Sequence, residues 1–158
     1  MTTIIADRRS MAADSQVSWE GNLGFKSPKL FRIGNSIYGI SGDNWGNVFI
    51  EWAKTGFNEK KKPQLHLANN WEDIDFDVLE LAPTGLYLWD KHFVRIELKD
   101  DNYSIGSGSK FAIAFMRKMN MSPEEAVKEC CNFDDYTREP VDVMTLIKEE
   151  NEKVSKKI

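Results

Sequence analysis

The sequence contains few of the residues on which metal centres and disulfide frameworks depend. Its 158 residues include two cysteines, the adjacent Cys130 and Cys131, and two isolated histidines, His66 and His92. Adjacent cysteines do not easily bridge each other, and neither residue type has the spacing of a zinc site. We therefore expect small buried cysteines in a reducing cytoplasm, structural or surface histidines, and no requirement for a metal or cofactor.

Long apolar runs and basic clusters are also missing. No segment approaches the length of a membrane span, and the N-terminus does not read as a secretory signal. The net charge is −4 and the basic residues are dispersed, which argues against a nucleic-acid surface. With 41% hydrophobic residues, the chain has the composition of a globular protein. We expect one cytoplasmic domain over 2–147 and a polar tail over 148–158, with neither nucleic acid nor membrane as partner.

Strand signals come in runs rather than in strict alternation with helices, which favours an α+β fold with antiparallel sheets. We expect polar connections at 19–28 and 58–63, while 66–77 has no clear pattern. The expected strands are 2–6, 10–15, 29–33, 36–41, 78–81, 85–89, 93–98 and 141–146, and the expected helices are 44–56, 110–119 and 122–132.

Thr2 is the residue with the clearest chemical potential. Removal of the initiator methionine before a small residue would leave Thr2 with a free α-amino group beside its hydroxyl. That amine titrates near pH 8 and can accept a proton from the hydroxyl at neutral pH. A threonine after methionine is also common in ordinary proteins, so the rest of the chain must supply a site around it.

The first hairpin supplies a carboxylate near this threonine. If Ala6 pairs with Ser10 across a turn at 7–9, Asp14 lies directly opposite Thr2. A slip of one residue would send Asp14 to the other face of the sheet.

Four short motifs follow Thr2 in a fixed order. They are Ala12-Ala13-Asp14-Ser15, Lys29-Leu30-Phe31-Arg32-Ile33, Gly39-Ile40-Ser41-Gly42-Asp43 and Ile105-Gly106-Ser107-Gly108-Ser109. Together they resemble the proteasome β-subunit family of N-terminal-nucleophile (Ntn) hydrolases, and within it the HslV-type peptidases, including short bacterial or phage members. The resemblance implies a four-layer αββα sandwich of two antiparallel sheets flanked by helices.

The resemblance also implies a role for each matching residue. Thr2 matches the nucleophile, Asp14 and Lys29 the carboxylate–lysine pair beside it, and Gly42 the glycine whose N–H helps form the oxyanion hole. A cation near the Thr2 amine would keep that amine unprotonated and able to accept a proton. By themselves, Asp14 and Lys29 would read as an ordinary ion pair and Gly42 as a turn glycine.

Ser107 completes the catalytic set, and two further residues match the family less closely. Ser107 matches the serine that lies near the nucleophile and relays protons; its Gly-Ser-Gly run lacks the pattern of a nucleotide-binding loop. Asp134 and Thr137 resemble an Asp-x-x-Ser pair that supports the site, with threonine in place of serine. Capping of a helix end explains these last two residues equally well.

One region departs from the family. Two long helices normally follow the oxyanion glycine, whereas here a single helix is followed by the short segment 58–77. In the family these helices contribute to ring assembly and to docking of an AAA+ ATPase unfoldase. This departure leaves the ring size and the ATPase partner open.

The sequence as a whole predicts a threonine-type endopeptidase. It would hydrolyse peptides or unfolded proteins inside a homo-oligomeric ring, through Thr2 after removal of Met1. Two alternatives remain, namely an Ntn amidase that acts on a small amide and a catalytically silent assembly protein with the same fold.

Overall fold

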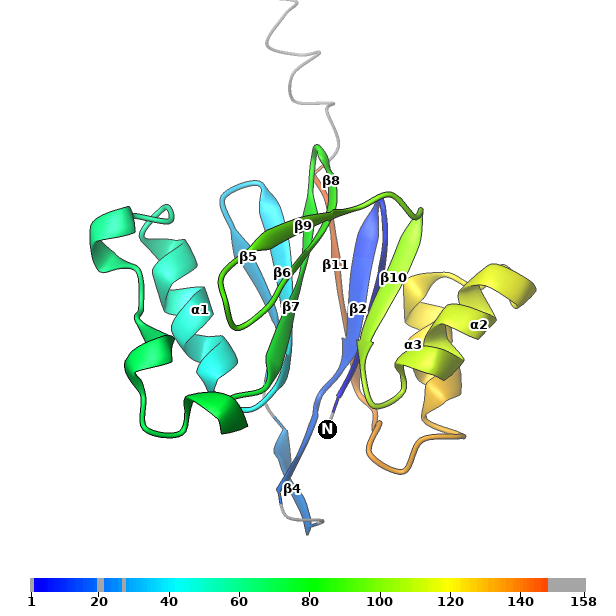
Figure 1. Ribbon diagram of the computed structural model, residues 1–158. Helices are drawn as coiled ribbons and strands as arrows, with labels where there is room; N and C mark the ends of the chain where they lie inside the picture. The colour runs from blue at the N-terminus through cyan, green and yellow to red at the C-terminus, as the bar shows by residue number, and fades with distance from the viewer. Residues whose placement is uncertain (1, 20–21, 27, 148–158) are drawn as a thin grey trace, which may run out of the picture.

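The computed structural model describes residues 2–19, 22–26 and 28–147, which form two large antiparallel sheets between layers of helix and a separate two-stranded sheet (Figure 1). The first sheet has the strand order β10-β1-β2-β11 and is covered by α2 and α3. The second has the order β5-β6-β7-β8-β9 and is covered by α1. The predicted αββα sandwich is confirmed. The predicted tail 148–158 lies outside the described residues.

The first sheet is built around the N-terminal hairpin. β1 (Thr3–Asp7) and β2 (Ser10–Asp14) form its centre, and β10 (Asn102–Gly106) and β11 (Val141–Thr145) form its edges. Side chains alternate strictly: Ile4 and Ala6 face the second sheet, while Ile5 faces the helices. One face of β1 therefore packs into the core between the sheets, and the other packs against the helices.

The register of this hairpin differs from the prediction by one residue. Ala6 pairs with Met11 rather than with Ser10, which brings Thr3, not Thr2, opposite Asp14. The reason lies in the turn, where the Asp7 carboxylate accepts hydrogen bonds from the backbone N–H groups of the two residues at 9 and 10, both at 2.8 Å. A two-residue turn at 8–9 replaces the predicted three-residue turn.

The second sheet begins with the predicted hairpin of β5 (Leu30–Ile33) and β6 (Ser36–Gly42). It continues through β7 (Phe76–Ala82), β8 (Gly85–Trp89) and β9 (Arg95–Leu98). Residues of both sheets pack together in the middle of the sandwich, where most are fully buried: Ile4, Ala6, Met11, Ala13, Leu30, Ile37, Leu79, Leu81, Leu86 and Ile105.

An aromatic cluster joins α1 (Trp45–Lys54) to the outer face of the second sheet. Phe49 is fully buried and its ring lies 5.1 Å from that of Trp89, in an edge-to-face arrangement. The segment after α1 forms three 3₁₀ helices instead of a second long helix: Glu59–Lys61, Leu65–Leu67 and Trp71–Asp73. The predicted departure from the two-helix pattern is thus confirmed.

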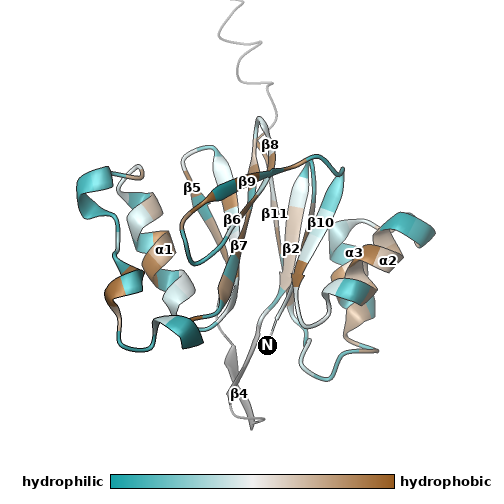
Figure 2. Ribbon diagram, in the orientation of Figure 1, coloured by the Kyte–Doolittle hydropathy of each residue, from teal (hydrophilic) through white to brown (hydrophobic). Residues whose placement is uncertain are grey.

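Two helices cover the first sheet. α2 (Ser109–Met119) and α3 (Pro123–Cys130) pack against Ile5 and Ala12, and both helices mix hydrophobic and hydrophilic stretches (Figure 2). Ser122 caps α3 by accepting a hydrogen bond from the N–H of Glu125 at 3.2 Å. Among the described residues, no helix has both the length and the apolar character needed to cross a membrane.

Two parts of the topology are absent from the sequence prediction. The region of the expected connection 19–28 contains most of a hairpin of β3 (Gln16–Trp19) and β4 (Asn22–Lys26), which projects from one end of the sandwich (Figure 1). β10 was also missed, because its polar residues lack the alternation of a half-buried strand.

Candidate active site

Thr2 lies just before β1, at the end of the sandwich from which the β3–β4 hairpin projects (Figure 1). It is only 6% exposed. Because Ile4 and Ala6 face the second sheet, the same alternation assigns Thr2 to the space between the sheets and Thr3 to the helical side.

A cleft with a volume of about 520 Å³ opens at Thr2. Its walls come from the start of β1, the end of β10, the end of β6 and the start of β7. The residues that line it are Thr2, Ser41, Gly42, Asp43, Asp75, Phe76, Asp77, Gly106 and Ser107. Three sequence-predicted site residues, Thr2, Gly42 and Ser107, therefore share one cavity.

Two glycines of this cleft occupy positions that exclude side chains. Gly42 has a φ of +104°, and a Cβ there would overlap the backbone of Asp75 and Phe76. Gly106 has a φ of +95°, and a Cβ there would overlap the carbonyl group of Thr2. These close approaches bring the backbone of both sheets to the cleft.

Behind Thr2 lies a buried ion pair. The Lys29 ammonium is 2.9 Å from Oδ1 of Asp14, and the residues are 5% and 0% exposed. The Asp14 carboxylate also accepts hydrogen bonds from the backbone N–H groups of Thr3, at 3.0 Å, and Arg138, at 3.2 Å. The predicted Asp14–Lys29 pair thus forms. Asp14 binds the backbone N–H of Thr3, the residue after Thr2, instead of lying opposite Thr2 itself.

Burial alters the proton affinity of this lysine. Desolvation lowers the pKa of Lys29 from its ordinary value, while the charge of Asp14, the hydrogen bond to it and the charge of Asp142 act in the opposite direction. A lysine in such a position gives up its proton more readily than one on the surface.

A second polar network reaches Thr2 from the helical side. The Ser107 N–H donates to the Thr2 carbonyl oxygen at 2.6 Å, and the Ser107 hydroxyl lies 2.7 Å from Oδ2 of Asp134. The same Asp134 oxygen accepts from the Thr137 hydroxyl at 2.5 Å, and Thr137 Oγ1 lies 2.7 Å from Thr3 Oγ1. Asp134 and Thr137 therefore belong to the surroundings of Thr2 and do more than cap a helix end.

The proton positions in this network follow from its geometry. A carboxylate accepts only, so Thr137 gives its single hydroxyl proton to Asp134. Thr3 must then donate to Thr137. Ser107 likewise gives its proton to Asp134, because its alternative contact with the Thr2 carbonyl is longer, at 3.3 Å. Lone pairs of Ser107 Oγ are left to accept a proton from a neighbour.

Sequence reasoning overlooked three groups of this site. Thr3 links both networks, which the shifted register would have indicated. The Arg138 N–H contacts Asp14 across 124 residues, and no local pattern predicts such a contact. In the acidic wall of the cleft, Asp75 and Asp77 fell in a segment without a clear pattern, and Asp43 was named only as the last residue of a motif.

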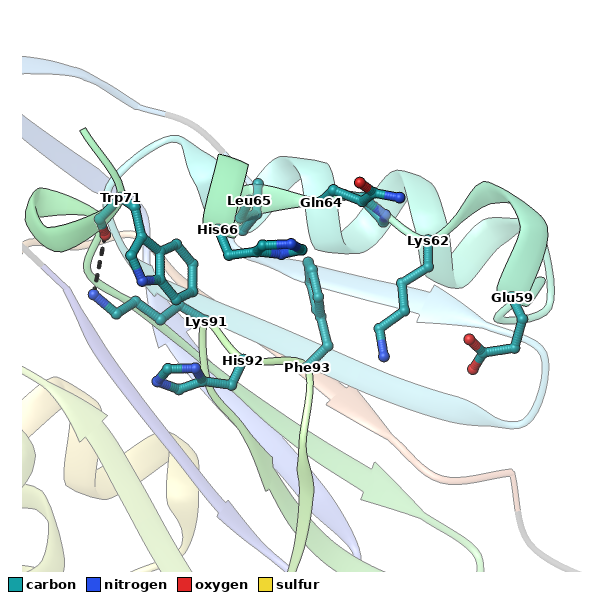
Figure 3. Close-up of a pocket in the computed structure, with 10 residues that line it drawn as sticks. Glu59, Lys62, Gln64, Leu65, His66, Trp71, Lys91, His92 and Phe93 are labelled. Carbon is teal, nitrogen blue, oxygen red and sulfur yellow. Dashed lines mark hydrogen bonds between the residues drawn. The ribbon is translucent and has the colours of Figure 1, made fainter. Parts of the chain in front are cut away.

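Another cavity, of about 570 Å³, lies among the 3₁₀ helices and the connection from β8 to β9 (Figure 3). Both histidines, His66 and His92, line it together with Trp71, Lys91 and other residues of 59–93. It shares no lining residue with the Thr2 cleft.

The cysteines lie away from the cleft, on and just after α3. Cys130 is fully buried as predicted, and burial raises the pKa of its thiol to about 12. Cys131 is only half-buried.

Comparison with solved structures matches this fold over almost the whole chain. Eukaryotic HslV from Trypanosoma brucei aligns with a TM-score of 0.72 and 19% identity, over 92% of this chain and 99% of that one. The fold is that of HslV and its proteasome-like relatives. No protein-family model and no curated protein matches the sequence.

Two other structures share this HslV-like fold. Thiobacillus denitrificans BPH, solved in complex with epoxomicin, aligns with a TM-score of 0.65 and 22% identity, over 93% of this chain and 99% of that one. A Gly-1 mutant of Anbu from Hyphomicrobium sp. strain MC1 has a TM-score of 0.65 and 12% identity, over 92% and 81%. The HslV-like fold is thus retained at low sequence identity.

Proposed function

We propose that this protein is a threonine-type endopeptidase whose nucleophile is Thr2 after removal of Met1. The observation that carries the proposal is the position of Thr2, nearly buried in a cleft that it shares with Gly42 and Ser107. Its HslV-like fold supports a hydrolase of the Ntn type.

The reaction would proceed in two stages. The Thr2 hydroxyl attacks the peptide carbonyl and transfers its proton to the α-amine of the same residue, which then protonates the leaving amine. Donors that include the Gly42 N–H hold the negative charge on the carbonyl oxygen, a contribution of about 3 kcal/mol per fixed donor. Water then hydrolyses the resulting ester, with the amine as general base, and regenerates Thr2.

The surrounding networks would prepare the amine for this work. The positive charge of Lys29 disfavours a second positive charge on a nearby amine and so lowers the amine's pKa. Asp14 holds the lysine, and Asp134 holds Ser107 with an oxygen lone pair able to accept from the amine.

We also propose that the subunits assemble into a homo-oligomeric ring. Phe111, Met119 and Phe133 on and near α2 and α3 are 42%, 60% and 57% exposed, and the rings of Phe111 and Phe133 stack at 5.8 Å. Apolar groups gathered in this way are typical of protein interfaces. Light scattering at micromolar concentration should show an oligomer, and a monomer would contradict this assembly.

An ATP-driven unfoldase is the partner expected of such a ring. The purified protein should then degrade unfolded proteins and peptides while leaving folded proteins intact. Degradation of folded substrates without ATPase would remove the need for that partner.

Intact-mass spectrometry with a peptide epoxyketone tests the catalytic proposal. This probe is chosen because BPH was solved with epoxomicin. The untreated protein should lack the mass of Met1, and the treated protein should gain one probe. Thr2→Ala should take up no probe and Thr2→Ser should retain part of the activity, while Thr84→Ala, a matched change at an exposed turn, should behave as wild type.

The alternatives give different results. An Ntn amidase would take up an electrophile at Thr2 but hydrolyse only small amides, not peptides. A silent assembly protein would form the oligomer without labelling. An N-terminally extended protein that is as active as the trimmed one would rule out the terminal-amine mechanism.

A further inference from the structure

The wall of the Thr2 cleft contributed by the second sheet is acidic. Asp43, Asp75 and Asp77 all line it, and the described lining contains no lysine, arginine or histidine. The nearest cation of the site, Lys29, is buried in its pair with Asp14.

Strand alternation fixes where this wall faces. On β7, Leu79 and Leu81 pack between the sheets, so Asp77 lies on the same face, at the open end of that core. Phe76 points the other way, into the aromatic cluster under α1. On β6, Ser41 is the direct cross-strand partner of Asp77 and shares its face. Both side chains therefore look toward the sheet that carries Thr2.

The three carboxylates are not equivalent. Asp43 is engaged by the fold, because it accepts from the N–H groups of Trp45, at 2.9 Å, and Asp75, at 2.8 Å. The Asp75 and Asp77 carboxylates have no hydrogen-bond or ion-pair partner among the described residues. Burial, together with the charges of Asp75 and Asp90, raises the pKa of Asp77. A cation in the cleft would relieve that repulsion.

Two neutral side chains in the cleft also point to a ligand. Ser41 is 9% exposed and Thr2 is 6% exposed, yet neither hydroxyl makes a hydrogen bond to another described residue. No side-chain oxygen of the described residues is both fully buried and unpaired, so these two hydroxyls are open to the cleft. Both hydroxyls are thus placed to meet a polar ligand that enters the cleft.

We infer that this cleft selects peptides with a lysine or arginine side chain next to the scissile bond, held by the carboxylates of Asp75 and Asp77. The inference rests on the proposed peptidase function and names its substrate class. A long side chain with a terminal cation would reach along the wall while the backbone lies at Thr2. A metal ion is a poorer occupant, because no group of side chains in the described part of the chain is arranged to hold one.

Paired fluorogenic peptides test the inference. The two peptides differ only in arginine or citrulline, its uncharged isostere, at the residue before the cleaved bond; a second pair carries the change two residues upstream. For the first pair we expect kcat/KM to be at least about tenfold higher with arginine, and the ratio to fall at high salt. A preference confined to the second pair would contradict the inference, because the cation would then not lie next to the scissile bond. In Asp75→Asn/Asp77→Asn the ratio should fall to about one.

The control is Asp100→Asn/Asp101→Asn, which removes the same charge from an exposed turn and should keep the preference. Thermal unfolding verifies that both double variants fold. If the protein takes up the epoxyketone and cleaves peptides but arginine and citrulline are equivalent, the inference is wrong while the peptidase stands. A preference that survives Asp75→Asn/Asp77→Asn equally overturns it. Absence of both labelling and cleavage contradicts the peptidase itself.

Discussion

Two buried carboxylates in this molecule each hold a cation, and they differ in nearly everything else. Asp14 pairs with Lys29 at 2.9 Å, with side chains 0% and 7% exposed. Glu80 pairs with Arg95 at 3.0 Å, with side chains 4% and 41% exposed. One pair lies behind Thr2 and the other on the outer face of the second sheet.

The Glu80–Arg95 pair is held by several hydrogen bonds and by a contact with an aromatic ring. Arg95 donates from Nε and Nη2 to the two carboxylate oxygens, both at 3.0 Å, and its guanidinium lies 3.5 Å from the centre of the Tyr87 ring. The indole N–H of Trp89 donates to Glu80 at 2.9 Å, and the hydroxyl of Tyr38 donates at 3.4 Å. Arginine stays charged at all accessible pH values, so the cation of this pair does not titrate.

In the Asp14 pair, burial shifts the pKa of the cation itself. Burial lowers the pKa of Lys29. The Asp14 carboxylate also accepts hydrogen bonds from the backbone N–H groups of Thr3 and Arg138. The pair thus ties together the first strand and the segment before β11 directly beside Thr2. Under the proposed function, the lysine pair lies beside the nucleophile and the arginine pair belongs to the scaffold.

The largest expected effect comes from neutralising the lysine. Lys29→Met keeps the length of the side chain but leaves Asp14 buried without its cation. We expect peptide hydrolysis to fall by about 10²–10⁴-fold, because the Thr2 amine loses the charge that keeps it unprotonated. The free energy of unfolding should fall by about 3 kcal/mol, since two backbone N–H groups still donate to Asp14.

A double variant separates the two losses. In Asp14→Asn/Lys29→Met both charges are absent, so stability should return to near wild type while hydrolysis and epoxyketone labelling stay low. Urea unfolding and labelling rates, measured on the same samples, check this. Recovery of activity together with stability would reduce the pair to a purely structural role.

The next effect is on the scaffold pair. Glu80→Gln removes the charge but leaves an oxygen for the Trp89 N–H. We expect a loss of about 1–3 kcal/mol in the free energy of unfolding, because the half-exposed Arg95 can return to water. Labelling of Thr2 in the folded protein should be unchanged. If Glu80→Gln is fully folded but Thr2 is labelled more slowly, the Glu80–Arg95 pair also affects the Thr2 site.

Local patterns in the sequence predicted most of the strands and helices, because strand alternation, turns and helix caps are short-range. The αββα sandwich and the candidate site residues came from the resemblance to a family. Local patterns did not predict the register at Thr2, which depends on how Asp7 holds the turn at 8–9. They also missed contacts that join distant segments, such as Thr3 with Thr137. The segment 66–77, which leads to the acidic wall at Asp75, has too little periodicity to be read alone.

A third carboxylate, Asp77, extends the comparison because it has no cationic partner among the described residues. Its folded-state pKa is raised by burial and by Asp75 and Asp90, so the protonated form fits the fold better than the ionised one. Its contribution to stability is complete below the unfolded pKa, near 3.8, and is lost as the pH rises through the higher folded value.

The variant Asp77→Asn cannot ionise, so its free energy of unfolding should not decrease in this way as the pH rises. Because the side chain is partly solvated, we expect the melting temperature to rise by only about 1–2 °C at pH 7, with no difference at pH 3. Thermal unfolding of both proteins at the two pH values measures this, and a variant less stable than wild type at pH 7 would mean that Asp77 already has a cationic partner in the assembled protein.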